Sequence, residues 1–195
     1  IHKQGPISRK ELAEQTNYSS ATISNHVKTL LQQDFVRETE KGFSTGGRRP
    51  VYLQVNPNKG YILTVDIEVH EIKIWIFDLQ LEIVNKTKLP VKNGGQPNRT
   101  LQRIFTVIND DLKQEGLEPE DLVGIGVSAP GLIDKAGRTL KFAPNLTWSE
   151  VNIWEQFKNR YELPVILENE ANAAAIGEQK FAYPEKDNLV YISVN

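Results

Sequence analysis

The sequence contains no cysteine, and this absence excludes several kinds of protein. Without cysteine the chain forms no disulfide bond, has no cysteine nucleophile and offers no thiolate ligand to zinc. Disulfide frameworks are typical of small secreted domains. The composition therefore favours an intracellular protein, and we expect a cytoplasmic location.

Long hydrophobic runs are also missing. The longest mainly apolar stretch, residues 122–133, is interrupted by Ser128, Pro130 and three glycines. A helix that spans a bilayer needs about 20 consecutive apolar residues, so we expect neither a membrane-spanning segment nor a signal peptide. With 195 residues, 39% of them hydrophobic and 25% charged, the chain is typical of a soluble globular protein with one large or two small domains.

Charge is unevenly distributed along the chain, although the net charge is only −2. Residues 1–60 carry 9 lysines and arginines against 5 aspartates and glutamates, a balance of +4, whereas residues 61–195 carry 14 against 20, a balance of −6. A basic head therefore precedes an acidic body. Such a balance permits binding to a polyanion but also fits an ordinary solvated surface. The residue pattern within residues 1–60 has to distinguish these two interpretations.

The head begins with the signature of two helices joined by a tight turn. Ser8 and Glu11 have the spacing of a capping box, which predicts a short helix over residues 9–15. Asn17 tolerates the left-handed conformation that a tight turn requires. A second helix is predicted from an apolar stripe at i, i+4, i+7 and i+8, formed by Ile23, Val27, Leu30 and Leu31.

The opposite face of this second helix carries small or hydrogen-bonding side chains. Such side chains reach base edges and phosphates without blocking entry into a DNA groove, which is typical of a recognition helix. A protein-binding helical hairpin with a polar face is the alternative interpretation. The candidate DNA-binding residues on this helix are Ser20, Thr22, Ser24, Asn25 and Lys28.

A β-wing is predicted after the second helix. Two strand-like runs, residues 35–39 and 51–55, flank a polar segment that contains glycine. Arg48 and Arg49 lie beside glycines in that segment, and an arginine pair on a flexible segment can enter the narrow minor groove of A·T-rich DNA or contact phosphates. Both are candidate DNA-binding residues, with a merely solvated linker as the alternative.

The body shows alternating strand and helix patterns. Residues 61–67, 72–77 and 81–89 predict three successive strands that pair antiparallel. Residues 101–112 repeat apolar side chains along one helix face, and the alternation predicts an α/β fold. The remaining predicted elements are strands at 123–127, 164–167 and 188–194 and helices at 151–161 and 170–181.

Two segments of the body offer groups that suit a ligand. In residues 124–134, a strand runs into a Pro-Gly turn that allows close approach to the backbone. In residues 168–175, a strand gives way to a helix, where Asn169 and Glu170 offer an amide and a carboxylate to the hydroxyls of a polyol. Helix capping by Asn169 is the alternative interpretation of this second segment.

Asp66 closes the first predicted strand of the body. It is either a candidate to bind a ligand or a metal, or an aspartate that forms a turn.

No helix opens directly behind the glycines of residues 124–131, so a dinucleotide-binding fingerprint is absent. No Gly-Lys-Ser/Thr follows them either, which excludes a P-loop. No motif therefore predicts nucleotide binding.

Five motifs follow one another along the chain: Pro6-Ile7-Ser8-Arg9, Gly46-Gly47-Arg48-Arg49-Pro50, Pro130-Gly131-Leu132-Ile133-Asp134, Ala143-Pro144-Asn145 with Trp148, and Glu168-Asn169-Glu170-Ala171-Asn172-Ala173. In this order they resemble the ROK family of sugar-responsive repressors and sugar kinases, and the likeness covers essentially the whole chain. The resemblance implies an α/β protein in which a winged helix-turn-helix domain with wing and linker (residues 1–57) precedes the first lobe of an actin-like, ribonuclease-H-like sugar-binding domain (residues 58–195). The second lobe is largely missing, so we expect a fragment truncated at the C-terminus.

The resemblance also implies the ligand site. Gly131, Asn145, Asn169 and Glu170 match family positions around a bound sugar. In the family's kinases the first strand leads into Asp-x-Gly-x-Thr and the general base is an aspartate, whereas here Glu68 stands at the glycine position and Glu170 at the base. We therefore expect no enzyme and no catalytic residue. No metal or cofactor is expected in this segment, and the family's zinc site would lie beyond residue 195.

The resulting hypothesis is a transcriptional repressor that binds double-stranded operator DNA as a homodimer or dimer of dimers and leaves it when a sugar binds. D-xylose is the expected sugar effector. Two alternatives stay open: an ATP-dependent sugar kinase with a DNA-binding head, and a repressor controlled by another sugar or by a protein partner.

Overall fold

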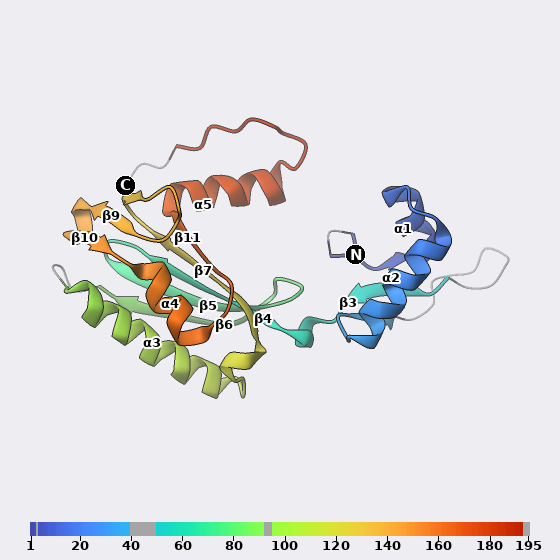
Figure 1. Cartoon of the computed structure of the whole chain (residues 1–195), viewed down its shortest axis with the longest axis horizontal. Helices are drawn as coiled ribbons and strands as arrows, with labels where there is room; N and C mark the ends of the chain where they lie inside the picture. Colours follow the sequence, from blue (N-terminus) through green and yellow to red (C-terminus); the bar gives the residue numbers. More distant parts are fainter. Residues whose placement is uncertain (3, 40–49, 92–94, 193–195) are drawn as a thin grey trace. The chain divides into compact units, whose positions relative to one another are not determined.

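The computed structural model describes residues 1–2, 4–39, 50–91 and 95–192. Two compact units make up the chain (Figure 1). The first comprises Ile1–Gly60 and Asp78–Glu82, and the second comprises Tyr61–Phe77 and Ile83–Asn195. The first unit is therefore discontinuous in sequence, because it includes the five-residue segment Asp78–Glu82, which connects two stretches of the second unit.

Two helices of the head form where the sequence predicts them. Helix α1 (Arg9–Thr16) begins with the expected capping box, in which the Glu11 amide donates to Ser8 Oγ and the Ser8 amide donates to Glu11 Oε2 at 2.8 Å. Asn17 ends α1 in the left-handed conformation at φ 56°. Helix α2 (Ser20–Gln32) then begins behind Ser19, whose hydroxyl accepts from the Thr22 amide.

A small antiparallel sheet completes the head, in the order β1–β3–β2. Its strands are β1 (Ile7–Ser8), β3 (Tyr52–Val55) and β2 (Val36–Thr39). The predicted pair of wing strands is thus present as β2 and β3, while residues 40–49 lie outside the described residues. Helices and sheet share one buried core, formed by Ile7, Leu12, Ile23, Val27, Val36 and Leu53.

The body is built on a five-stranded mixed sheet in the order β11–β7–β4–β5–β6. The central strands β4 (Tyr61–Ile67) and β7 (Leu122–Ala129) are parallel, as are β7 and β11 (Val165–Asn169). Strands β5 (Glu71–Asp78) and β6 (Ile83–Pro90) are antiparallel. Because β4, β7 and β11 run in the same direction, their carboxyl ends meet at one edge of the sheet.

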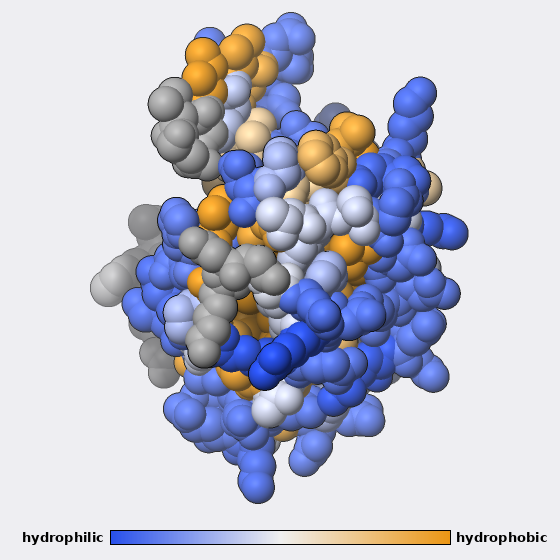
Figure 2. Space-filling model, turned by 90° about the vertical axis from the view of Figure 1, so that its left-hand side faces the viewer, coloured by the Kyte–Doolittle hydropathy of each residue, from blue (hydrophilic) through white to orange (hydrophobic). Residues whose placement is uncertain are grey.

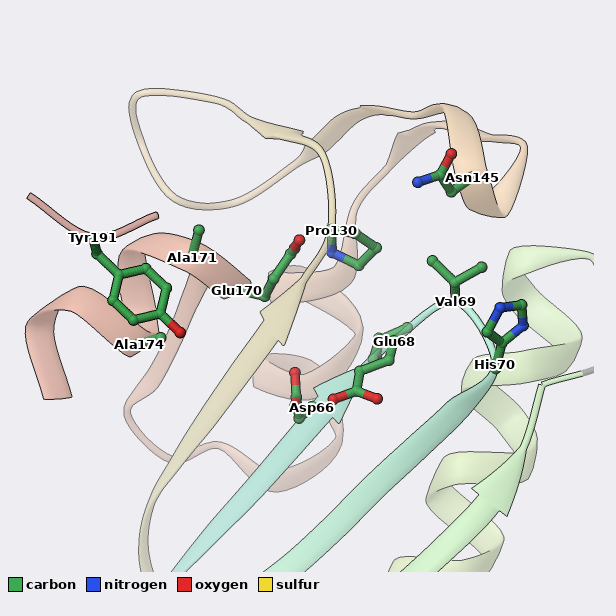
Figure 3. Close-up of a pocket in the computed structure, with 11 residues that line it drawn as sticks. Asp66, Glu68, Val69, His70, Pro130, Asn145, Glu170, Ala171, Ala174 and Tyr191 are labelled. Carbon is green, nitrogen blue, oxygen red and sulfur yellow. The ribbon is translucent and has the colours of Figure 1, made fainter. Parts of the chain in front are cut away.

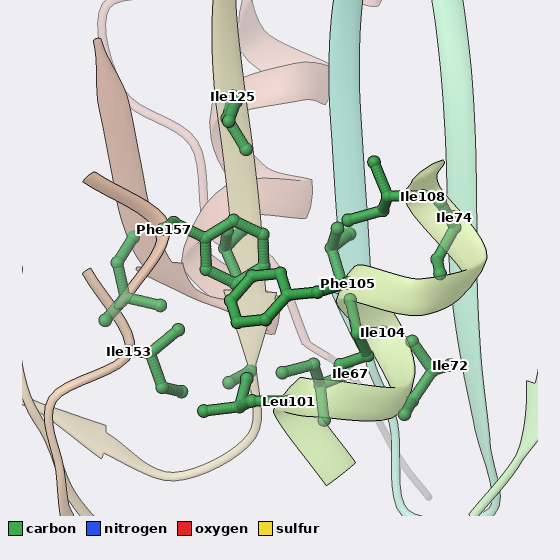
Figure 4. Packing of buried hydrophobic residues seen from close by; sticks show 14 of the residues in the cluster. Ile67, Ile72, Ile74, Leu101, Ile104, Phe105, Ile108, Ile125, Ile153 and Phe157 are labelled. Atoms are coloured by element: carbon green, nitrogen blue, oxygen red, sulfur yellow. The ribbon is translucent and has the colours of Figure 1, made fainter. Parts of the chain in front are cut away.

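Two helices cover one face of this sheet. Helix α3 (Pro97–Gln114) and helix α4 (Ile153–Tyr161) pack their apolar stripes against the buried side chains of β4, β5 and β7. Phe105 and Phe157 meet edge to face with ring centroids 4.9 Å apart (Figure 4). Strand residues on this face are almost completely buried, since Ile67 and Ile74 are 0% exposed. The core therefore fixes the sheet edge that carries the candidate site.

A second small sheet lies outside the sequence prediction, whereas the fifth helix agrees with it. The strands β8 (Leu132–Ile133), β9 (Leu140–Ala143) and β10 (Trp148–Val151) have two to four residues each, too short for a two-residue alternation to stand out. Helix α5 (Glu170–Gly177) continues as one π-helical turn (Glu178–Ala182), which together match the helix predicted over 170–181.

The strand predicted over residues 188–194 is wrong for the part that the structure describes. Residues 188–192 form no strand, and Val190 and Ile192 are 88% and 79% exposed. An apolar run becomes a strand only where a neighbouring strand takes up its backbone hydrogen bonds, and no described strand lies beside this one.

The described helices include none that is both long and apolar enough to cross a membrane. The surface in Figure 2 is largely hydrophilic, with smaller hydrophobic areas between the polar side chains.

A buried carboxylate between α3 and β6 gives a testable effect on stability. Asp111 is 6% exposed, accepts from Thr87 Oγ1 at 2.9 Å through Oδ1, and has no hydrogen-bond partner for Oδ2 among the described residues. Burial, only partly offset by the Thr87 hydroxyl, raises the pKa of Asp111, and the charges of Asp110 and Glu115 raise it further. The folded protein thus holds this proton more tightly than the unfolded chain, so stability falls as the pH rises through the raised pKa.

Asp111→Asn is expected to increase the free energy of unfolding by about 1 kcal/mol near neutral pH, because the amide keeps an acceptor for Thr87 and carries no charge. Below the ordinary carboxyl pKa of 3.8 the wild-type group is also uncharged and the gain should disappear. Urea denaturation at several pH values measures the difference, and a gain that grows as the pH falls would contradict the assignment.

Candidate functional site

A pocket of 740 Å³ lies at the carboxyl edge of the body's sheet (Figure 3). This is the edge at which open α/β sheets usually bind their ligands, and the volume lies within the usual range for small-molecule sites. The turn between β4 and β5, the Pro-Gly turn after β7 and the start of α5 surround it. The lining residues are Asp66, Ile67, Glu68, Val69, His70, Pro130, Asn145, Glu170, Ala171, Ala174 and Tyr191.

Asp66 sits near the end of β4 and is tied to the neighbouring strand. Ser128 Oγ on β7 donates to Asp66 Oδ1 at 2.6 Å. Burial raises the pKa of Asp66, the Ser128 hydrogen bond opposes that rise, and the nearby charge of Glu68 adds to it. The aspartate therefore lines the pocket rather than forming a turn.

Glu68 lies at the pocket floor beside Asp66 and forms an ion pair with Lys73. Lys73 also lies 3.6 Å from Glu71, and the Glu68 hydrogen bond raises the pKa of the Lys73 ammonium. The ammonium group of Lys73 is thus already paired with two carboxylates. A phosphate group brought to this floor would meet two acidic side chains.

Glu170 is the first residue of α5 and its carboxylate lies in the pocket. Its Oε2 is buried and has no hydrogen-bond partner within the described ranges. A buried polar atom without a partner is costly and needs an explanation. An ionised carboxylate can only accept hydrogen bonds, so Oε2 is suited to a ligand that donates one.

The side chain of Asn169 forms hydrogen bonds within the protein and does not line the pocket. Its Oδ1 caps α5 by accepting from the amides of Ala171 and Asn172 at 2.9 and 3.2 Å. Its Nδ2 donates to the carbonyl of Gly131 at 2.9 Å, so the side chain locks the Pro-Gly turn against the start of α5. The helix-capping interpretation is therefore realised, and neither Asn169 nor Gly131 is among the lining residues.

Asn145 does line the pocket, on the wall opposite Glu170 (Figure 3). It lies in a short 3₁₀ turn, Pro144–Leu146, between β9 and β10. The buried Trp148, whose indole nitrogen donates to the Gly95 carbonyl at 2.9 Å, anchors the strand that follows this turn. The small sheet, which sequence patterns do not reveal, is what brings Asn145 to the site.

Several lining residues escape the sequence analysis. Val69 and His70 belong to the turn after β4, and Tyr191 comes from the segment that follows α5. Val69 and His70 could have been found as direct neighbours of Asp66 in the sequence. Tyr191 has no such signal, because its place depends on how a segment without secondary structure folds back.

The Pro-Gly turn beside the pocket has a strict backbone requirement. Gly131 has φ +101°, a Cβ at this position would overlap the Phe142 carbonyl oxygen, and it would lie 2.8 Å from Ala143 Cα. We expect Gly131→Ala to lower the free energy of unfolding by about 2 kcal/mol or more, since backbone on both sides must shift.

The matched control for Gly131→Ala is Gly177→Ala at the end of α5. A Cβ there meets nothing within 4 Å, so the variant should change stability by less than about 1 kcal/mol. Thermal or urea denaturation compares the two substitutions. Equal stability of both variants would show that the turn tolerates a side chain.

Four of the five DNA-binding residues predicted on α2 are exposed. Ser20, Ser24, Asn25 and Lys28 are exposed, whereas Thr22 is half-buried with its hydroxyl 2.9 Å from Ser19 Oγ. The buried positions Ile23 and Val27 face the head's core, so these polar residues lie outside that core. Arg48 and Arg49 lie outside the described residues.

Known families match both the body and the head. The sequence profile of the ROK family matches residues 62–195, which hold the body's sheet and the pocket. The chain belongs to the ROK family. A second profile, that of the MarR family, matches residues 1–41, which include α1 and α2. A helix-turn-helix head and an α/β ROK domain are thus both present in this ROK protein.

Individual relatives agree with this assignment. The chain is 37% identical to the xylose repressor of Bacillus subtilis over 100% of its own length and 50% of that protein. The structure of a ROK family transcriptional regulator, described as a homologue of the Escherichia coli Mlc protein, matches 95% of this chain and 47% of that one with a TM-score of 0.73 at 22% identity. The structure of a ROK family glucokinase from Streptomyces griseus, solved with glucose and AMPPNP, matches 63% of this chain and 37% of the glucokinase chain. Its TM-score is 0.50 at 29% identity. The chain spans about half the length of the curated xylose repressors it matches.

Proposed function

We propose that this ROK protein is a sugar-responsive transcriptional repressor, in which the head binds operator DNA and a sugar in the pocket releases it. The curated relative with 37% identity is a xylose repressor, which supports D-xylose as the effector. We propose further that the protein acts in the cytoplasm and binds a two-fold symmetric operator as a homodimer or a dimer of dimers.

The observation that carries the proposal is the unpartnered carboxylate oxygen of Glu170 in an acceptor-rich pocket. Asp66, Glu68 and Glu170 all present carboxylates to the pocket, and Asn145 adds an amide that both donates and accepts. A ligand that donates several hydrogen bonds and carries no negative charge suits this lining best. Neutral sugars with adjacent hydroxyl groups meet both conditions.

The head supports the DNA-binding half of the proposal. Its α2 has an exposed polar face, and helix α2 packs on a sheet whose strands β2 and β3 flank the wing. Residues 1–60 also carry the positive balance that attracts a polyanion. The candidate contacts are Ser20, Thr22, Ser24, Asn25 and Lys28 to the major groove, and Arg48 and Arg49 to the minor groove or phosphates.

The proposal needs no metal or cofactor in this segment. Within the described residues no group of three or more histidine, aspartate or glutamate side chains is placed to hold a metal ion. Cysteine is absent from the sequence, so the zinc site that the ROK resemblance implies finds no thiolate ligands in this chain. No step of the proposed regulation is assigned to zinc.

A sugar kinase is the second candidate, favoured by the match to the glucokinase solved with glucose and AMPPNP. Against it stands the Glu68–Lys73 ion pair at the strand end where a nucleotide phosphate would have to lie. Sugar-dependent ATP hydrolysis by the purified protein distinguishes the two functions. The proposed repressor produces none at millimolar sugar and ATP.

Operator binding tests the main proposal. A labelled fragment from the protein's own control region is titrated with the natural full-length protein at fixed salt, in the presence of D-xylose, D-glucose or N-acetylglucosamine in turn. We expect D-xylose to weaken binding by roughly 5- to 150-fold, the usual range of allosteric coupling. If none of the three sugars weakens binding, the sugar-effector assignment fails and a protein effector becomes the better hypothesis.

A further inference from the structure

An aromatic pair lies on the surface of the head, where α2 begins. Tyr18, in the turn between α1 and α2, is 58% exposed, and its ring centroid lies 6.5 Å from that of His26, an exposed residue of α2. The side-chain hydrogen bonds described around α2 use the hydroxyls of Ser19, Thr22 and Thr29, but neither the Tyr18 hydroxyl nor the His26 ring. The aromatic pair therefore presents its polar atoms to the outside of the head.

The turn that carries Tyr18 is held on both sides. Asn17, directly before it, ends α1 in the left-handed conformation at φ 56°. Ser19, directly after it, caps α2: its Oγ accepts from the Thr22 amide at 3.1 Å, and its carbonyl accepts from the Ile23 amide at 3.0 Å. The backbone position of Tyr18 is thus fixed before any partner binds, and a preorganised contact loses little entropy on binding.

Helix geometry places His26 on one flank of the face that points away from the core. Successive residues of an α-helix are about 100° apart. Ile23 and Val27 are buried in the head's core, so Asn25, midway between them in the sequence, points away from that core. Ser24 and His26 then point to opposite sides of Asn25. Tyr18 lies on the His26 side, since the two rings are neighbours.

The width of a DNA groove determines what side chains on such a flank contact. A helix with its side chains is about 10–12 Å across, and the major groove is about 12 Å wide. When α2 lies in the groove with Asn25 toward the base edges, its flanks face the sugar–phosphate walls. Tyrosine is one of the side chains that donate hydrogen bonds to phosphate oxygens. The positive balance of residues 1–60 also favours an anionic partner.

We propose that Tyr18 and His26 form a contact to the sugar–phosphate backbone on one wall of the major groove. Tyr18 donates from its hydroxyl to a phosphate oxygen, and His26 is the positioning residue that supports the tyrosine ring. This inference rests on the proposed function and adds two residues that the sequence analysis does not select. A backbone contact fixes the head on the duplex but carries no sequence information, so it strengthens binding to any DNA by the same factor.

Tyr18→Phe tests the phosphate contact, because it removes only the hydroxyl. The natural full-length protein and its variant are titrated by fluorescence anisotropy with an operator fragment and with a scrambled fragment of the same length, at several salt concentrations. We expect Tyr18→Phe to weaken binding to both fragments equally, by roughly 2- to 10-fold, the equivalent of one hydrogen bond. The salt dependence should equal that of wild type, because a neutral donor releases no counterion.

His26→Ala tests the support that the imidazole ring gives to Tyr18. In the His26→Ala background, Tyr18→Phe should weaken binding less than it does in the wild-type protein, because the two residues act together. Tyr183→Phe is the matched control, since Tyr183 is 51% exposed but belongs to the second unit. This control should bind both fragments as wild type does, and thermal denaturation checks that all variants remain folded.

The outcomes separate this inference from the proposed function. If the wild-type protein binds the operator and Tyr18→Phe binds both fragments equally well, the Tyr18 hydroxyl does not contact DNA and the backbone contact is wrong. A loss confined to the operator contradicts it too, because Tyr18 then reads a base. Additive effects of the two substitutions would remove the positioning role from His26. A wild-type protein that binds neither fragment overturns the proposed function, and this inference falls with it.

Discussion

Glu170→Gln is expected to abolish most of the sugar response. The substitution keeps the shape of the side chain, but the buried Oε2 position becomes either an uncharged acceptor or an amide donor. A hydrogen bond to a charged group contributes about 1.5–3 kcal/mol, so sugar affinity should fall by roughly 10- to 100-fold. Calorimetric titration with D-xylose measures this loss, and operator affinity without sugar should stay unchanged because the head does not contain Glu170.

Glu178→Gln provides the control for this prediction. Glu178 is exposed, lies in the π-helical turn that follows α5, and does not line the pocket. The control removes the same charge from nearby without touching the site. If both variants bind D-xylose as the wild-type protein does, Glu170 does not accept a sugar hydroxyl and the pocket assignment is wrong.

Asn25→Ala is the substitution in the head with the largest expected effect. Asn25 is exposed on α2, and an asparagine side chain can pair with the edge of an adenine in the major groove. A good contact of this type discriminates by about 1–3 kcal/mol, so operator affinity should fall by roughly 10- to 100-fold. Fluorescence anisotropy with operator and scrambled DNA measures the change in affinity. The affinity for the scrambled fragment should fall much less than the affinity for the operator.

Lys28→Ala provides the comparison on the same helix. Its exposed ammonium group is suited to phosphates, so its loss should weaken binding to both fragments and reduce the salt dependence of binding by about one released ion. Circular dichroism checks that both variants keep the helical signal of wild type. If Asn25→Ala weakens binding to the operator and to the scrambled fragment equally, Asn25 does not contact bases.

The elements of the head could be predicted closely because their signals are local. The capping box at Ser8 and Glu11, the left-handed Asn17 and the spacing of the apolar residues on α2 each depend on neighbours within one or two helical turns. The same holds for β4, which the sequence pattern places at its observed bounds, Tyr61–Ile67. Local rules suffice where the partner of each residue lies nearby in the chain.

The site was less predictable because distant segments assemble it. The match to family motifs points to Asn145, Asn169, Glu170 and Gly131, yet the structure gives them different roles. Glu170 and Asn145 line the pocket, while Asn169 caps α5 and holds the Gly131 carbonyl. Residue type alone does not distinguish a ligand contact from a cap. The hydrogen bond from Asn169 to the Gly131 carbonyl joins residues that lie 38 positions apart.

The remaining errors have a similar origin. Strands β8, β9 and β10 are stabilised by pairing with one another, a property that their few residues do not reveal in isolation. Residues 188–192 show the reverse, because an apolar run predicts a strand but the described chain provides it with no neighbour. In both cases the outcome depends on hydrogen-bond partners elsewhere in the fold.

The central claim is that sugar in the pocket and operator on the head oppose each other, and reciprocal binding tests it most directly. The affinity for D-xylose is measured by calorimetry with the protein free and with the protein saturated by operator DNA. Because coupling is reciprocal, operator should weaken sugar binding by the same factor by which sugar weakens operator binding, roughly 5- to 150-fold. An affinity for D-xylose that is unchanged by operator DNA, or no binding of D-xylose to either form, would contradict the account.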